Sequence, residues 1–216
     1  MKTSEVLARL QKDANPKNVE GMARFGISAK NTLGIPIPVL RSLAKEIGKS
    51  HTLAQDLWKS GIHEARILAA FVDEPTEVTE QQMDAWIKDF DSWDVCDQVC
   101  ANLFDRTRFA FAKAAQWVGH EQEFERRAGF ALMAALAWHD KAATDTQFEP
   151  FFVLINKYAT DERNFVKKAV NWALRQIGKR NASLHPKAIA CALEIEKLDS
   201  KSARWIAKDA LRELRK

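Results

Sequence analysis

The chain has 216 residues, of which 46% are apolar and 29% charged, and 33 Lys and Arg against 29 Asp and Glu give a net charge of +4. This composition is typical of one large or two small globular domains and excludes a disordered or fibrous chain. Only 8 Gly, 6 Pro and 1 Tyr are present. Such scarcity of turn and strand-forming residues argues against a β-sandwich or a Rossmann sheet.

The sequence also limits the cellular context. No apolar run approaches the roughly 18 residues of a membrane span, and charges occupy the N-terminal stretch where a signal peptide needs its apolar core. The three cysteines, Cys96, Cys100 and Cys191, are too few and odd in number for a disulfide scaffold. We therefore expect a cytoplasmic protein with reduced cysteines.

Apolar residues recur at helical spacing along nearly the whole chain, which predicts about a dozen short helices and no strand. The predicted helical segments are 5–10, 38–48, 63–72, 93–104, 106–119, 124–138, 150–159, 164–178, 185–198 and 202–214.

Capping residues predict where several of these helices begin and end. Thr79 followed by Gln82 forms a capping-box pattern, and Pro150 suits a first helical turn. Gly178 suits a helix end. Residues 139–149 form the longest segment without helical spacing, so we expect a loop there.

A charged residue set into an apolar stripe recurs along the chain, at gaps of 31, 30, 41 and 36 residues. The residues are Arg66, Asp97, Arg127, Lys168 and Arg204. These gaps are close to the period of HEAT-type repeats. We therefore predict an all-α fold over residues 1–216 as a single domain. Its architecture would be an α-solenoid of about six HEAT-like helix pairs in a right-handed superhelix, with these residues lining the concave face.

The C-terminal part of the chain is basic. Residues 161–216 hold 14 Lys and Arg against 7 Asp and Glu, a balance of 14 − 7 = +7. Such a balance favours a polyanionic partner such as nucleic acid, although a solvated helical face explains the charge equally well.

Asp97 is the exception in an otherwise basic series. It lies one helical turn from Trp93, and Cys100 and Phe104 continue the same stripe. An acid among apolar neighbours must be paired or lie at the edge of a cleft. Asp97 is therefore either a structural carboxylate or a catalytic one.

Other polar or aromatic residues on apolar stripes can likewise be either structural or functional. Arg127 either forms a salt bridge with Asp97 or contacts a ligand, whereas its neighbour Arg126 is expected to be solvated. Trp172 lies four residues after Lys168, so an indole and an ammonium group share one helix face. Trp93 and Trp172 are core residues or site residues on spacing alone.

Motifs for other chemistries are missing from the sequence. It contains no paired zinc ligands, no HExxH, no GxGxxG, no Walker A loop and no GxSxG. We expect no metal and no cofactor.

The residues singled out so far carry a resemblance to a known family. The chain resembles the AlkD-like family of bacterial DNA alkylation repair glycosylases, which are built from HEAT-like repeats. The similarity lies in Met22–Phe25, in Leu33–Pro38, in Trp93-x-x-x-Asp97, in Arg127 within ERRAGF and in Trp172 within FVKKAVNWALR. These elements occur in the family's order and cover most of the chain.

The resemblance implies a site and an activity. The two Trp residues and the Asp of the family surround the damaged nucleotide, with the Arg beside them, so Trp93, Asp97, Arg127 and Trp172 would form the site here. The family acts on the stacked base, whereas most glycosylases flip it into a pocket. Two departures are Phe25, where members often have Tyr, and a longer interval between Arg127 and Trp172.

The implied chemistry agrees with a lone carboxylate. A purine alkylated at N3 or N7 is cationic and leaves without a general acid, so the remaining task is to stabilise an oxocarbenium-like sugar, which Asp97 would do. We therefore expect a monomeric glycosylase that removes N3-methyladenine and N7-methylguanine from double-stranded DNA. Arg66, Lys168 and Arg204 would contact phosphates. The alternatives are a DNA-binding module without chemistry and a protein-binding scaffold.

Overall fold

A computed structural model describes all residues from 1 to 216, and the chain is entirely helical, with 13 α-helices, two 3-10 turns and no strand. This result confirms the prediction of an all-α protein of about a dozen helices. The helices form two compact units, Met1–Thr107 and Arg108–Lys216. A single domain over residues 1–216 stays a prediction.

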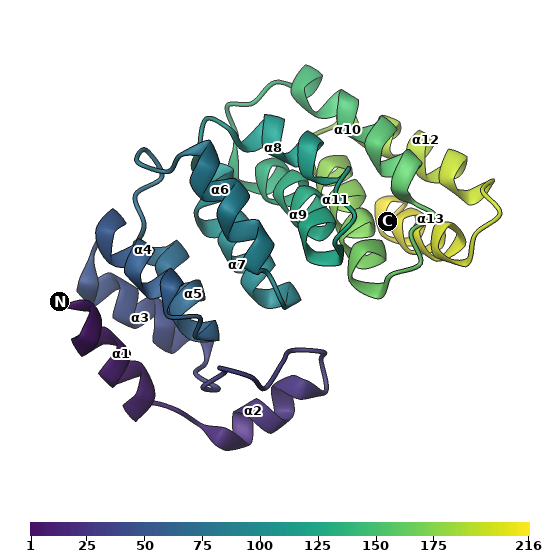
Figure 1. The fold of residues 1–216 in the computed structure, drawn as a ribbon. Coiled ribbons are helices and arrows are strands. Elements are labelled where there is room, and N and C mark those ends of the chain that lie inside the picture. The colour runs from purple at the N-terminus through teal and green to yellow at the C-terminus, as the bar shows by residue number, and fades with distance from the viewer. The chain divides into compact units, whose positions relative to one another are not determined.

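The first unit is built around α5, which packs between α3 and α7, while α4 covers α5 (Figure 1). Its helices are α1 (Thr3–Lys12), α2 (Pro16–Ala23), α3 (Ile37–Ile47), α4 (His51–Lys59), α5 (His63–Val72), α6 (Glu80–Trp86) and α7 (Trp93–Asn102), with the 3-10 turns η1 (Ile87–Asp89) and η2 (Phe104–Arg106).

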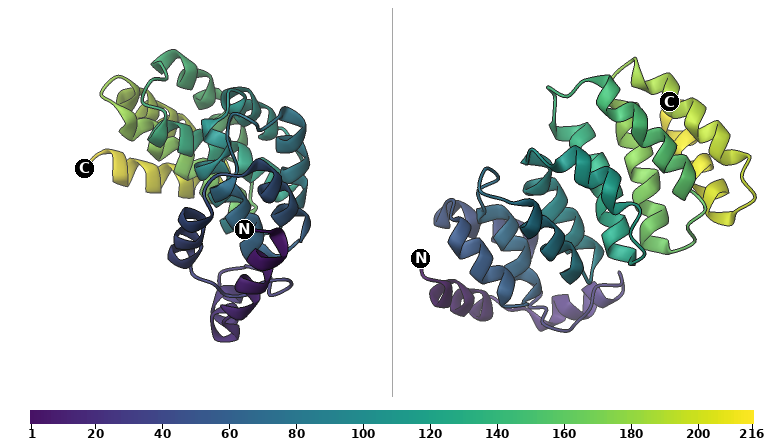
Figure 2. Two further views of the ribbon diagram at one scale, coloured as in Figure 1. Left: turned by 90° about the vertical axis from the view of Figure 1, so that its left-hand side faces the viewer. Right: turned by 45° about the horizontal axis from the view of Figure 1, so that its top comes forward.

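The second unit has two layers. One layer contains α9, α11 and α13, which pack side by side, and the other contains α8, α10 and α12 (Figures 1 and 2). The helices are α8 (Ala110–Trp117), α9 (Glu123–His139), α10 (Asp145–Tyr158), α11 (Asn164–Arg180), α12 (Leu184–Glu196) and α13 (Lys201–Leu214). Residues 127–137 of α9 are all buried, because neighbouring helices cover this helix on several sides.

Several hydrogen bonds between helices share one sequence separation within each unit. The separation is 31 residues for Trp58–Asp89 and His63–Asp94, and 38 residues for Asn171–Asp209 and Lys187–Glu149. A recurring separation of this size is typical of a repeated helix pair. The predicted repeats are thus present, with a longer unit in the C-terminal half.

Of the predicted helix ends at Thr79, Pro150 and Gly178, the one at Thr79 is correct and the other two are wrong. The Thr79 hydroxyl accepts a hydrogen bond from the Gln82 backbone N–H at 3.1 Å, as predicted. Pro150 instead lies inside α10, because a capping box of Thr144 and Gln147 starts that helix earlier. The loop after α9 is correspondingly only residues 140–144.

Gly178 is also not a helix end, because α11 continues to Arg180. A Cβ atom at Gly178 would lie 2.7 Å from the Ala188 Cβ and 2.9 Å from the Leu214 Cδ2. The residue is therefore glycine because α12 and α13 both pack closely against α11 at this point.

Candidate nucleic-acid interface

Helix α7 carries Trp93 and Asp97 on its half-exposed side. Asp94 and Gln98 share that side, whereas the opposite side consists of fully buried residues. The buried residues are Val95, Cys96, Val99 and Cys100. Asp97 therefore lies at the boundary between the core and the surface, where a carboxylate keeps contact with water.

Trp93 is held in place by a segment distant in sequence. Its indole Nε1 donates a hydrogen bond to the Phe25 carbonyl oxygen at 3.0 Å. The Phe25 ring itself is exposed. The bond connects the start of α7 to the residues that follow α2, so the indole has a defined position on the surface of the first unit.

The segment that contains Phe25 is anchored by a buried acid that the sequence analysis missed. The Glu64 side chain, in the first turn of α5, accepts hydrogen bonds from the backbone N–H groups of Leu33 at 2.8 Å and Gly34 at 2.7 Å. A third bond comes from Ile35 at 3.3 Å. The residue is only 1% exposed. Its position inside the apolar run HEARILAAFV was the signal available in the sequence.

His63, which was not predicted as a site residue, connects α5 to α7 beside Trp93. Its Nε2 lies 2.8 Å from the Asp94 Oδ2. Burial opposes the charging of His63, but the hydrogen bond and charge of Asp94, with Glu64 and Asp91, outweigh it and raise the pKa of His63. Burial likewise opposes ionisation of Asp94, but His63 and Ser92 lower its pKa below the usual value. Each group thus favours the charged form of the other.

The cysteines of the first unit do not provide a nucleophile. Burial raises the pKa of the Cys100 thiol well above its usual value, and the neighbouring Cys96 and Asp97 raise it further. In the second unit, burial raises the pKa of Cys191 to about 12. All three thiols are free and buried. Because the thiolate is the reactive form of cysteine, buried thiols of this kind are poor nucleophiles.

In the second unit, Arg127 connects α9 to α11. The side chain is 6% exposed, and its NH1 donates to the Phe165 carbonyl oxygen at 2.6 Å. One turn further along α11, Lys168 is exposed, and Trp172 is half-exposed another turn on. Arg127 thus contacts α11 at Phe165, and Lys168 and Trp172 follow on that helix.

The expectation that Arg126 is solvated is wrong. Its NH1 lies 2.7 Å from the Asp161 Oδ2, and its guanidinium lies 4.7 Å from the centre of the Tyr158 ring. The side chain turns into the contact between helices because a carboxylate and an aromatic ring are both available there.

The two remaining predicted cations differ in exposure. The Arg66 side chain is 15% exposed, donates to the Asp89 carbonyl oxygen at 2.9 Å and lies 5.3 Å from the Trp58 ring centre. Arg204 is 55% exposed, and its only ion pair is with the surface residue Asp199. The Arg204 guanidinium is thus accessible to a phosphate, whereas the Arg66 side chain is mostly buried and bonded within the protein.

Helix α13 presents an exposed basic stripe with an indole in its middle, which the sequence analysis missed. Its members recur at helical spacing and are Lys201, Arg204, Trp205, Lys208 and Arg212. The Lys167 ammonium of α11 lies 5.2 Å from the Trp205 ring centre. A cationic surface with an exposed aromatic ring is typical of nucleic-acid binding.

The predicted site residues belong to two units. Trp93 and Asp97 share α7 in the first unit, and Arg127, Lys168 and Trp172 lie in the second. No cluster of three or more His, Cys, Asp or Glu side chains is placed to hold a metal ion. None of the helices combines the length and the apolar character needed to cross a membrane.

Comparison with known proteins gives a family and a fold. The family model for DNA alkylation repair enzyme matches residues 6–214. No curated protein matches the chain. One solved structure is similar with a TM-score of 0.82 and 21% sequence identity, over 99% of this chain and 96% of the other. It is described as "a new family of proteins related to the HEAT-like repeat DNA glycosylases with affinity for branched DNA structures". The all-helical, repeated architecture is therefore the HEAT-like one, and the chain belongs to the DNA alkylation repair enzyme family.

Proposed function

We propose that this protein binds double-stranded DNA as a monomer and hydrolyses the N-glycosidic bond of purines alkylated at N3 or N7, leaving an abasic site. The observation that carries this proposal is the position of Asp97. It is an acid on the half-exposed side of α7, one turn from an oriented indole, in a member of the DNA alkylation repair enzyme family.

The proposed chemistry needs little from the protein. An N3- or N7-alkylated purine carries a formal positive charge and departs as a neutral base, so no general acid is required. As the glycosidic bond stretches, positive charge develops on the sugar, and the Asp97 carboxylate stabilises it electrostatically. Water then adds to the sugar carbon and loses a proton, which completes the hydrolysis.

The other site residues have supporting roles in this proposal. Trp93 lies against the sugar and backbone of the cationic nucleotide, and its attraction to that charge is worth about 0.5–2 kcal/mol. That attraction disappears when the neutral base leaves. Trp172, in the second unit, contacts the DNA backbone. Arg127 maintains the α9–α11 contact through the Phe165 carbonyl, so it positions Lys168 and Trp172.

The proposed DNA contacts come mainly from exposed cations. Lys168 and Arg204 contact phosphates, together with the basic stripe of α13. Arg66 contributes less, because its guanidinium already binds the Asp89 carbonyl. Binding through phosphates predicts an affinity that falls steeply with salt concentration.

The test is excision of 7-methylguanine from a duplex with one such lesion, followed by alkaline strand cleavage. Asp97→Asn should lower the single-turnover rate by about 10²–10³-fold, the usual effect of removing one electrostatic contact to a transition state. DNA affinity should stay within about two-fold. Asp91→Asn, an exposed neighbour with the same charge change, should keep full activity. A near-normal rate for Asp97→Asn would refute the catalytic role.

A second candidate function is binding of branched DNA without chemistry. The similar solved structure, described as having affinity for branched DNA, favours it. It predicts tighter binding of a four-way junction than of a duplex of equal length. It also predicts no abasic product at any protein concentration, and identical behaviour of Asp97→Asn and wild type.

A further inference from the structure

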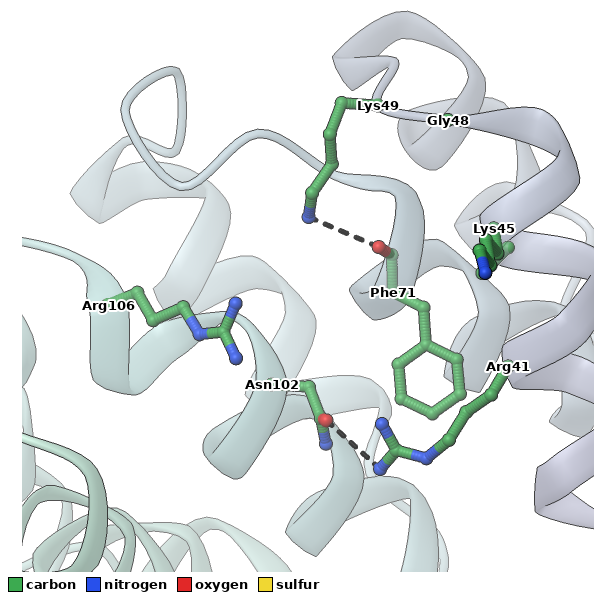
Figure 3. A pocket seen from close by; sticks show the side chains of 8 residues that line it. Arg41, Lys45, Gly48, Lys49, Phe71, Asn102 and Arg106 are labelled. Atoms are coloured by element: carbon green, nitrogen blue, oxygen red, sulfur yellow. Dashed lines mark hydrogen bonds between the residues drawn. The ribbon is translucent and has the colours of Figure 1, made fainter.

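The first unit contains a cavity of about 360 Å³ that none of the residues discussed so far explains. It lies where the C-terminal ends of α3, α5 and α7 meet η2 (Figure 3). Its principal lining side chains are Arg41, Lys45, Lys49, Phe71, Asn102 and Arg106. In Figure 3 the side chains of Arg41, Lys49 and Arg106 approach the space around Phe71 and Asn102 from different sides.

The cavity is strongly cationic. Four of its lining residues are Lys or Arg, and none is Asp or Glu. Neither Lys45 nor Arg106 forms an ion pair, and both are exposed. The nearest acids lie outside the lining: the Asp73 carboxylate is bound by His51 and Gln82, and the charge of Glu74 acts on Lys49. Four like charges around one cavity repel each other, which an incoming anion relieves.

Two of the cations are oriented by the fold. The Arg41 guanidinium donates to the Asn102 Oδ1 at 3.1 Å and lies 4.6 Å from the Phe71 ring centre. The Lys49 ammonium donates to the Phe71 carbonyl at 3.1 Å and to the Asp73 carbonyl at 2.7 Å. These contacts leave donors on both groups, since a guanidinium has five N–H bonds and an ammonium three.

The chemistry of the lining selects phosphate over a nucleobase. The one aromatic ring in the cavity, Phe71, has a guanidinium over it, so it is not open for a base to stack upon. A guanidinium fork and ammonium groups are instead the donors that bind phosphate oxygens. The burial of Lys49 lowers its pKa, and the charge of Arg106 lowers it further, against the opposing effect of Glu74.

We propose that this cavity binds a phosphate group of the DNA strand, an inference that rests on the proposed function of DNA binding. Helix α7 carries both Asp97 and Asn102, which are five residues apart, or about 7.5 Å along the helix axis. Each strand of duplex DNA carries one phosphate per about 3.4 Å of the duplex axis. A strand whose nucleotide lies at Asp97 therefore has phosphates within reach of the cavity.

The experiment measures DNA affinity as a function of salt for the double variant Lys45→Gln/Arg106→Gln. These two side chains make no hydrogen bond or ion pair within the protein, so the fold should be unchanged. Loss of one phosphate contact lowers the slope of log affinity against log salt by about 0.9, which is about a five-fold weaker affinity at 0.15 M salt. The matched control is Lys12→Gln/Lys88→Gln, an equal charge change at exposed residues of the same unit outside the cavity.

The outcomes separate this inference from the function on which it rests. If wild type binds duplex DNA and the cavity variant keeps its affinity and slope, or loses no more than the control, the cavity assignment is wrong. If wild type fails to bind duplex DNA at low salt, the proposed function is wrong and the cavity assignment falls with it. Duplexes with a 5′-phosphate or a 5′-hydroxyl distinguish the source of the phosphate. Equal losses on both assign an internal phosphodiester, and a loss only on the phosphorylated duplex assigns a terminal phosphate.

Discussion

The anchoring of the segment after α2 by Glu64 can be tested with a single substitution, Glu64→Gln. The carboxylate oxygens accept three backbone N–H bonds, from Leu33, Gly34 and Ile35, in a nearly fully buried position. An amide keeps one acceptor oxygen, which can retain the bonds from Gly34 and Ile35. Its NH2 group then faces the N–H of Leu33, donor against donor.

The expected cost follows from these contacts. Losing one charge-assisted bond and weakening two others to neutral acceptors costs about 4 kcal/mol. Burying a neutral amide costs less free energy than burying a carboxylate, and this difference offsets part of the loss. Glu64→Gln should therefore lower the free energy of unfolding by about 2–3 kcal/mol.

Urea denaturation measures the loss, and hydrogen exchange at the amides of Leu33 and Gly34 locates it. Glu46→Gln is the control, because Glu46 forms an exposed pair with Arg9 and should cost less than about 1 kcal/mol. If Glu64→Gln is no more destabilising than Glu46→Gln, or if exchange at the two amides is unchanged, the anchoring role is wrong.

Two further predictions concern the ion pair beside Trp93 and the packing of α11. The pKa of His63 is raised in the folded protein, so its stabilising contribution is complete below pH 6.5 and is lost as the pH rises through the raised value. The stability difference between wild type and His63→Gln, measured by urea denaturation, should therefore shrink from pH 6 towards pH 9; a constant difference would contradict the ion pair with Asp94. Gly178→Ala should lower the free energy of unfolding by about 1–3 kcal/mol through overpacking, although alanine favours a helix. Gly21→Ala in α2, where a Cβ meets nothing within 4 Å, should stabilise by up to about 1 kcal/mol, and equal effects of the two changes would refute the packing argument.

The stripe of apolar residues on each helix was enough to predict the elements that pack against a core. Helices α7, α9 and α11 begin within one residue of the predicted starts, because helical periodicity is a local property. Short helices such as α2, which contains no buried residue, were not predicted. Where the local signal was ambiguous, at Pro150 and Gly178, the prediction of helix ends was wrong.

For the candidate site, the sequence supplied Trp93 and Asp97 as a pair on one face, since residues four apart on a helix are neighbours. It did not reveal that the Phe25 carbonyl orients the Trp93 indole, nor that Arg126 turns into a helix contact. Those bonds join residues dozens of positions apart, and periodicity carries no information about such pairs.

The order of residues alone determined that this chain is helical, repetitive, basic towards its C-terminus and similar to DNA alkylation repair proteins. Only the tertiary structure showed which charges are committed to the fold and which are open, as the contrast between Arg66 and Arg204 shows. It alone brought Arg41, Lys49 and Arg106 around one cavity. The physical reason is that the residue type alone fixes which side chains are charged. Whether a charged side chain is buried, paired or close to others of its kind depends on how separate helices pack.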